Sequence, residues 1–124
     1  MKVEPVDERD IRWEDHYPRF RVYVFDEYGH RGEPDGTLSQ GYATGTWDVI
    51  DADLLDALRW AQDRAGERGL YSIALVADGY RTYTDRGLVW LVGMDYQDTP
   101  IDDRSREVQE QMLRRRDHLV VTPE

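Results

Sequence analysis

Cysteine is absent from this chain of 124 residues, asparagine is absent as well, and lysine occurs only once, at Lys2. Without cysteine the chain can form no disulfide, thiolate nucleophile, iron–sulfur cluster or zinc site with sulfur ligands. No apolar run approaches the length of about 18 residues that a membrane span needs, and the N-terminus is polar and acidic. These absences predict a cytoplasmic protein with no signal peptide and no contact with a membrane.

Aliphatic side chains are also scarce. Leucine, isoleucine, valine and phenylalanine make up 27 of the 124 residues, close to the level of about 20% below which a highly charged chain stays disordered. Four Trp and eight Tyr compensate for this scarcity, because aromatic side chains bury large areas. Since one domain usually has ~100–150 residues, we expect a single folded domain over residues 19–121, preceded by an N-terminal arm over residues 1–18.

Negative charge dominates the composition. The 26 Asp and Glu residues exceed the 16 Lys and Arg residues and give a net charge of −10. This sign disfavours direct binding to nucleic acid and to anionic membranes. The excess is concentrated between Asp26 and Asp56, where eight acidic residues are accompanied by a single base, Arg31. Such a block would attract a basic protein surface.

The hydrophobic pattern predicts the element order ββαββα. Strands are expected over four segments: 19–26, 37–47, 70–77 and 88–94. The third segment is predicted to be a central strand, and the fourth, which is the most hydrophobic run, a buried one. Helices are expected from an N-cap at Asp51 to residue 65, and from a cap at Asp102 or Asp103 to residue 116. The predicted fold class is α+β, a mostly antiparallel sheet with two helices packed on one face.

A tryptophan on the first predicted helix lies among carboxylates. Four acidic residues share the side of the helical wheel that Trp60 occupies: Asp53, Asp56, Asp63 and Glu67. An aromatic anchor surrounded by charge is typical of protein interfaces. The alternative is that Trp60 folds over the sheet edge or the second helix, while the acidic residues only solvate the surface.

The polar segment after the first predicted strand is a second candidate site, formed by Asp26, Glu27, His30 and Arg31. Two carboxylates can act as general acid and general base, so a ligand-binding or hydrolytic domain is an alternative function. However, the chain has no Gly-x-Ser-x-Gly nucleophile motif, no Gly-x-x-x-x-Gly-Lys phosphate loop and no His-Glu-x-x-His metal spacing. The sequence therefore favours a protein that is not an enzyme and uses no cofactor or metal.

Three segments resemble small actinobacterial proteins of unknown function. They are Tyr23-Val24-Phe25, residues 51–61 (Asp-Ala-Asp-Leu-Leu-Asp-Ala-Leu-Arg-Trp-Ala) and residues 87–91 (Gly-Leu-Val-Trp-Leu), and together they span most of residues 19–95. The resemblance implies a GC-rich source, in line with the excess of arginine over lysine. Because these proteins have no assigned activity, the resemblance adds no site residues.

These features predict a small acidic protein that masks a basic partner surface, as an immunity protein, an antitoxin or an inhibitor of a nucleic-acid-binding enzyme does. The expected partner-binding residues are Trp60, Asp53, Asp56, Asp63 and Glu67. A ligand-binding or hydrolytic domain around residues 26–31 is one alternative. A homo-oligomeric structural protein, in its simplest form a homodimer, is another.

Overall fold

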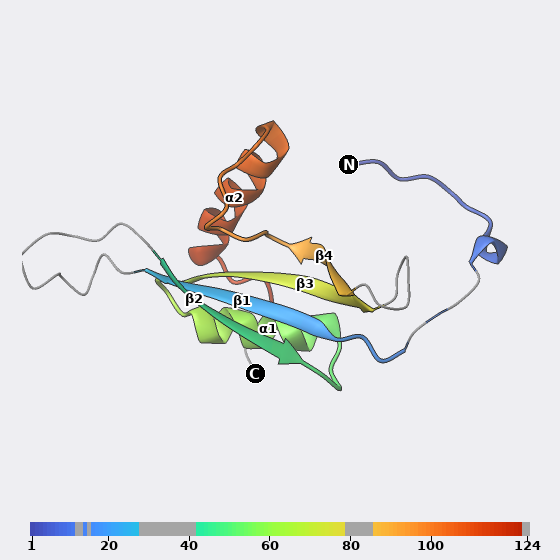
Figure 1. The fold of residues 1–124 in the computed structure, drawn as a ribbon, viewed down its shortest axis with the longest axis horizontal. Coiled ribbons are helices and arrows are strands. Elements are labelled where there is room, and N and C mark those ends of the chain that lie inside the picture. Colours follow the sequence, from blue (N-terminus) through green and yellow to red (C-terminus); the bar gives the residue numbers. More distant parts are fainter. Residues whose placement is uncertain (12–13, 15, 28–41, 79–85, 123–124) are drawn as a thin grey trace, which may run out of the picture.

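The structure is a computed structural model, and it describes residues 1–11, 14, 16–27, 42–78 and 86–122. Its elements are the 3-10 turn η1 (Glu8–Asp10), strands β1 (Phe20–Glu27) and β2 (Tyr42–Val49), helix α1 (Leu54–Ala65), strands β3 (Leu70–Asp78) and β4 (Arg86–Val92), and helix α2 (Asp103–Arg116). The strands form a sheet with a helix on either side (Figure 1). The predicted α+β class and the order ββαββα are confirmed.

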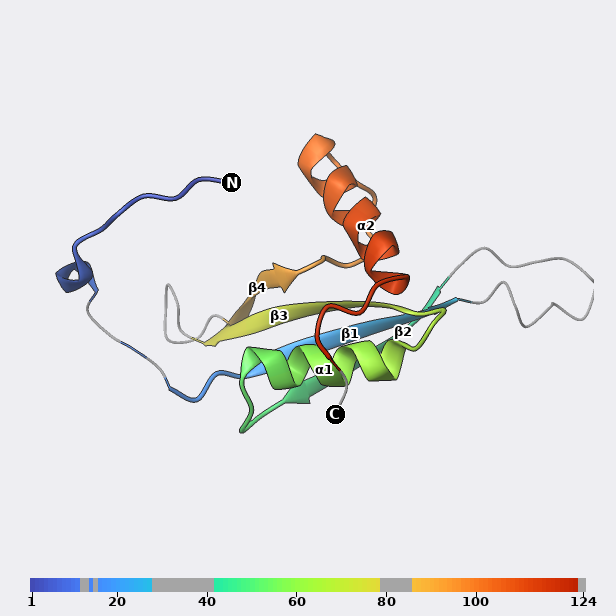
Figure 2. The same cartoon turned by 180° about the vertical axis from the view of Figure 1, so that it is seen from behind.

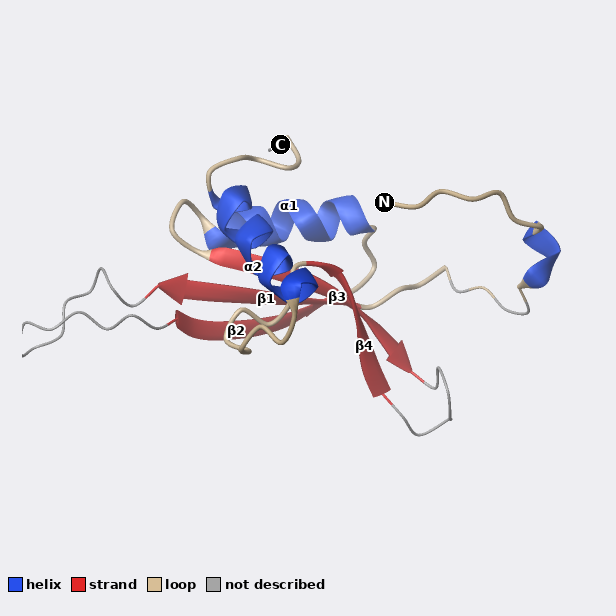
Figure 3. Cartoon of the chain, turned by 90° about the horizontal axis from the view of Figure 1, so that it is seen from above, coloured by secondary structure: helices blue, strands red, loops and turns tan. Residues whose placement is uncertain are grey.

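The four strands form one antiparallel sheet in the order β2-β1-β3-β4. β1 pairs with β2 as a hairpin and with β3 on its other side, where Phe20 lies opposite Leu75. The ladder between β3 and β4 continues further, to Asp78 opposite Arg86. The end of β3 and the first residues of β4, Arg86 to Leu88, therefore project beyond β1. Together they diverge from β1 and β2 (Figure 3).

The sheet has a hydrophobic cluster on each face. Phe20, Val22 and Val24 of β1 pack with α1 in one cluster, whereas Phe25 packs with Met112 of α2 in the other. Because neighbouring residues of a strand point to opposite faces, α1 and α2 cover opposite faces of the sheet (Figures 1 and 2). The prediction that both helices pack on one face is wrong, since β1 is apolar on both of its faces and each face needs a cover.

The first helix begins two residues later than predicted. Asp53, and not Asp51, is the N-cap: its Oδ1 accepts a hydrogen bond from the Asp56 N–H at 2.8 Å, and the Asp56 carboxylate accepts one from the Asp53 N–H at 3.3 Å. This reciprocal capping box satisfies two N–H groups that the first turn leaves unpaired. Asp51 instead adopts a left-handed φ of 58° in the preceding turn. The second helix begins after the predicted cap, Asp102.

Strand β4 is exposed on both faces. Leu88, Val89, Trp90 and Leu91 expose 36%, 44%, 37% and 42% of their surfaces. The prediction of a buried strand over residues 88–94 is therefore wrong. The reason is its position: β4 is an edge strand, and from Leu88 back to Arg86 its ladder with β3 also extends past the end of β1.

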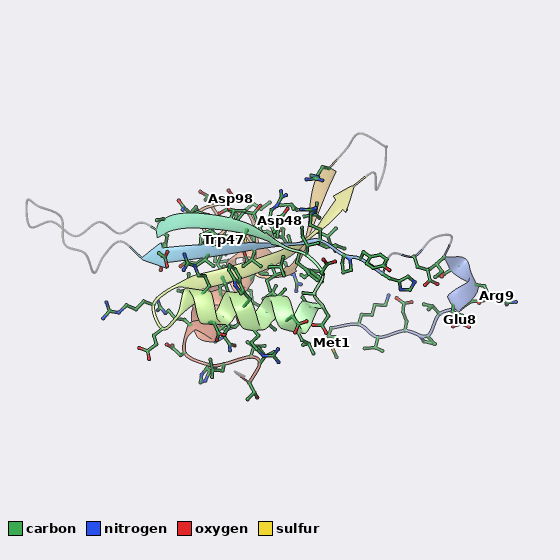
Figure 4. All side chains as sticks on the ribbon, turned by 90° about the horizontal axis from the view of Figure 1, so that it is seen from below. Met1, Glu8, Arg9, Trp47, Asp48 and Asp98 are labelled. Atoms are coloured by element: carbon green, nitrogen blue, oxygen red, sulfur yellow. The ribbon has the colours of Figure 1, made fainter. Side chains whose placement is uncertain are left out.

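Residues 1–11 lie apart from the sheet (Figure 4). η1, with Glu8 and Arg9, lies far from the strands (Figure 4). The apolar residues Ile11 and Tyr17 of the arm are 59% and 84% exposed, and Trp13 lies outside the described residues. In the part of the chain that the structure describes, no helix combines the length and the hydropathy of a membrane span.

Candidate protein-interaction surfaces

Trp60 packs against the edge of the sheet and is still partly exposed. Its ring centroid lies 5.4 Å from that of Trp47 on β2, with an angle of 67° between the two ring planes. This edge-to-face contact is a favourable geometry for aromatic pairs. The Arg64 guanidinium lies 5.1 Å from the centre of the Trp47 ring, within the range of a cation–π interaction. Even so, 39% of the Trp60 surface is exposed.

Gly45 makes room for the ring that supports Trp60. A Cβ atom at position 45 would overlap the six-membered ring of Trp47, so this ring lies close against the glycine backbone. Trp47 packs on the cluster beneath α1, whereas its neighbour Asp48 contacts arginines on the opposite face of β2 (Figure 4). The absence of a side chain at Gly45 thus allows a close aromatic contact.

The five residues predicted to bind a partner occupy three kinds of position. Asp56, Trp60 and Asp63 lie within α1, Asp53 is its N-cap, and Glu67 lies in the turn that follows the helix. Asp53 and Asp56 hold each other's backbone N–H groups in the capping box, so both have a structural role. Asp63 and Glu67 are exposed. We define the exposed side chains of Asp56, Trp60 and Asp63 as the Trp60 surface.

Two basic residues of α1 are engaged by other parts of the chain. The Arg59 Nε donates a hydrogen bond to the Thr122 carbonyl oxygen at 3.0 Å, and its Nη1 lies 3.5 Å from the Asp56 Oδ1. Arg64 lies over Trp47. Arg68, like Glu67, follows the helix. Within α1, Arg59 is half-buried, whereas Arg64 contacts Trp47 and is still exposed, as is Asp63 on the helix side that carries Trp60.

Gln62 is a buried polar residue with a structural role that the sequence pattern did not predict. This residue is only 6% exposed. Its Nε2 donates to the Val121 carbonyl oxygen at 2.9 Å, and its Oε1 accepts from the N–H groups of Val120 and Val121 at 2.7 and 3.3 Å. The side-chain amide therefore pairs with the C-terminal segment as a neighbouring strand would. Gln62 lies four residues after Leu58, on the buried side of α1. This helical spacing could have indicated that the residue is buried.

Asp48 is bound by Arg21 of β1 and by Arg19, which directly precedes this strand. The Arg21 Nε and Nη2 donate to its carboxylate at 2.7 and 3.1 Å, and the Arg19 Nη1 donates at 3.0 Å. The hydrogen bonds from Arg21, followed by that from Arg19, lower the pKa of Asp48 to about 2. This carboxylate of the acidic block thus links β1 to β2 and carries a charge that its own chain neutralises.

The second candidate site is only partly described. Asp26 is exposed and Glu27 is the last residue of β1, while His30 and Arg31 lie outside the described residues. Among the described residues, no group of three or more histidines and carboxylates is arranged to hold a metal ion. A carboxyl group needs a raised pKa to act as a general acid at neutral pH. Two carboxylates elsewhere in the fold show the opposite: hydrogen bonds from Ser105 lower the Asp102 pKa, and the arginines lower the Asp48 pKa.

A further apolar surface lies between β4 and α2. Trp90 contacts Tyr23 of β1, with ring centroids 5.1 Å apart. Trp90, Leu91 and Ile101 contribute to a groove with a volume of about 420 Å³. Ile101, which precedes the N-cap of α2, is 88% exposed.

Comparisons with known proteins add no assignment to these surfaces. No protein-family model matches the chain, and searches of curated proteins and of solved structures found no match.

Proposed function

We propose that this chain is a small acidic protein-binding protein that docks a basic partner through the Trp60 surface. The observation that supports this proposal is the exposed part of Trp60, which Trp47 supports from below and the exposed Asp63 flanks. Tryptophan is enriched among the few residues that carry most of the binding energy of an interface. A partly exposed indole beside a carboxylate therefore suits an anchor for a partner.

Charge favours a basic partner. With a net charge of −10, the protein attracts a positively charged surface and speeds its association, in a manner that salt weakens. A nucleic-acid-binding enzyme carries such a surface, so an immunity protein, an antitoxin or an inhibitor is the class that fits. We place this function in the cytoplasm, where a chain without cysteine suits the reducing conditions.

The packing around Trp60 lowers the cost of binding. An indole already held against Trp47 loses less side-chain freedom when a partner covers it. Arg64 also contacts the Trp47 ring and so helps to hold the aromatic pair in place. This packing favours an anchor that is ordered before the partner arrives.

Affinity capture from an extract of the source cells tests this proposal. The immobilised wild type is compared with Trp60→Ala and with Leu55→Ala, an exposed leucine on another side of the same helix. The captured protein is identified by mass spectrometry and then purified and recombined. We expect a protein with a basic surface that the wild type and Leu55→Ala retain and Trp60→Ala loses. Equal retention by Trp60→Ala, or capture of an acidic protein, would overturn the proposal.

A further inference from the structure

The outer edge of β4 is open in the part of the chain that the structure describes. The sheet order ends at β4, so one side of this strand carries backbone N–H and C=O groups without a neighbouring strand. Proteins usually protect such an edge with charged residues, proline or a covering element. β4 instead presents Leu88, Val89, Trp90 and Leu91, each exposed by more than a third.

We propose that β4 pairs with β4 of a second copy, antiparallel and about a two-fold axis at Val89, so that the two sheets join into one. A closed two-fold contact uses the same patch on both subunits, and an antiparallel strand pair can satisfy this symmetry. Val89 is the midpoint of Arg86–Val92. An axis at Val89 therefore centres the pairing on Leu88–Trp90, where the ladder with β3 is regular; the register shift of that ladder lies beyond Trp90.

This register matches apolar side chains on both faces. Leu88 and Trp90 lie on the same face, because they pair with Val76 and Ala74 of β3. The two-fold axis places Leu88 of each copy opposite Trp90 of the other, and Val89 opposite its own copy on the other face. Cross-strand pairs of aromatic and aliphatic residues are the contacts that stabilise antiparallel sheets.

The charge of β4 favours a second copy over a basic strand. Arg86 is the only charged residue of this strand, so a basic strand would gain no attraction here. In the proposed pairing, the two Arg86 residues lie at opposite ends, about 20 Å apart at ~3.3 Å per residue. At that distance their repulsion is largely screened at physiological ionic strength.

The proposed dimer is independent of partner binding at the Trp60 surface. Trp60 packs on β2, which is the opposite edge of the sheet from β4. Dimerisation therefore leaves Trp60 accessible. A contact built on one strand edge belongs to the small class of interfaces, below about 1,200 Å² in total, so we expect a dissociation constant on the order of 10 µM.

Sedimentation equilibrium across a concentration series tests this dimer. We expect the mass to rise from 14.6 kDa to about twice that value between about 1 and 200 µM. Val89→Lys and Val89→Glu each place like charges at the axis, so each should stay monomeric, whereas an equimolar mixture of the two should dimerise again. Leu55→Lys, a charge placed on an exposed leucine of α1, should dimerise like the wild type.

Three results would overturn the proposal. The first is a wild-type mass that stays at the monomer value over the whole series. The second is loss of the dimer in Leu55→Lys, and the third is failure of the mixed Val89 variants to associate. Circular dichroism of each variant shows whether it is folded, and Trp60→Ala should still dimerise whatever its effect on partner binding.

Discussion

The ion pairs of Asp48 make a specific prediction for the stability of the fold. Asp48→Asn keeps the shape of the side chain and removes its charge. The Asp48 carboxylate is 21% exposed and Arg21 is 24% exposed, so solvent screens this pair less than an ordinary surface ion pair, which contributes up to about 1 kcal/mol. A pKa lowered from 3.8 to about 2 corresponds to about 2 kcal/mol. We expect Asp48→Asn to be less stable than the wild type by about this free energy at pH 7.

The difference should depend on pH in one direction. Because the folded protein holds the Asp48 pKa below its ordinary value, the ionised carboxylate stabilises the fold fully above about pH 4. As the pH falls from 3.8 towards 2, Asp48 takes up a proton and this stabilisation is lost. The free energies of unfolding of the wild type and Asp48→Asn should therefore converge near pH 2.

Urea unfolding, followed by tryptophan fluorescence at a series of pH values from 7 to 2, measures this difference. Asp63→Asn is the matched control, because Asp63 is exposed on α1 and its replacement should change stability by less than about 0.5 kcal/mol. An Asp48→Asn protein as stable as the wild type at pH 7 would refute the reasoning. A stability difference that stays constant from pH 7 to pH 2 would refute it as well.

Three further predictions concern buried contacts. Gln62→Leu removes the hydrogen bonds to the C-terminal segment and should lower the free energy of unfolding by about 1–2 kcal/mol. The Val121 amide should then exchange its hydrogen faster than in the wild type. An unchanged exchange rate would contradict this prediction. Ser72→Ala should raise the free energy of unfolding, measured with urea, by about 1 kcal/mol, because the buried Ser72 Oγ has no hydrogen-bond partner among the described residues. A destabilised variant would count against this prediction. Gly93→Ala should lower the free energy of unfolding by about 1–3 kcal/mol and with it the melting temperature. The reason is that Gly93 has a φ of +72° and that a Cβ there would lie 3.1 Å from the Met112 side chain. An unchanged melting temperature would contradict this prediction.

Local patterns predicted most of the secondary structure. The alternation of β1, the apolar stripe of α1 and the acidic N-cap of α2 each depend on residues within a few positions of one another, and these elements are confirmed. The N-cap of α1 shifted from Asp51 to Asp53, because the reciprocal hydrogen bonds with Asp56 favour the later start.

The positions of the elements relative to one another could not be read from the same patterns. The exposure of Leu88–Leu91 results from the edge position of β4 and, at Leu88, from the register that carries β3 past the end of β1. No property of residues 88–94 alone encodes either placement. Likewise, the placement of α2 depends on Phe25 and Met112 meeting on the second face of the sheet.

The candidate site was predicted in part. Trp60 and Asp63 follow from helical spacing, but Glu67 falls outside the helix because α1 ends at residue 65. The contact with Trp47 and the engagement of Arg59 by Thr122 join segments far apart in the chain. Such contacts depend on the tertiary fold, so a helical wheel cannot show them.

The most direct test of the central claim is the dissociation constant of the captured basic partner, measured by titration calorimetry in solution. Trp60→Ala is compared with Trp90→Ala, because the two tryptophans are equally exposed, at 39% and 37%, and lie on different surfaces. We predict that Trp60→Ala weakens binding about thirtyfold, or about 2 kcal/mol, while Trp90→Ala stays within about threefold of the wild type. A Trp60→Ala protein that binds as tightly as the wild type would contradict the claim.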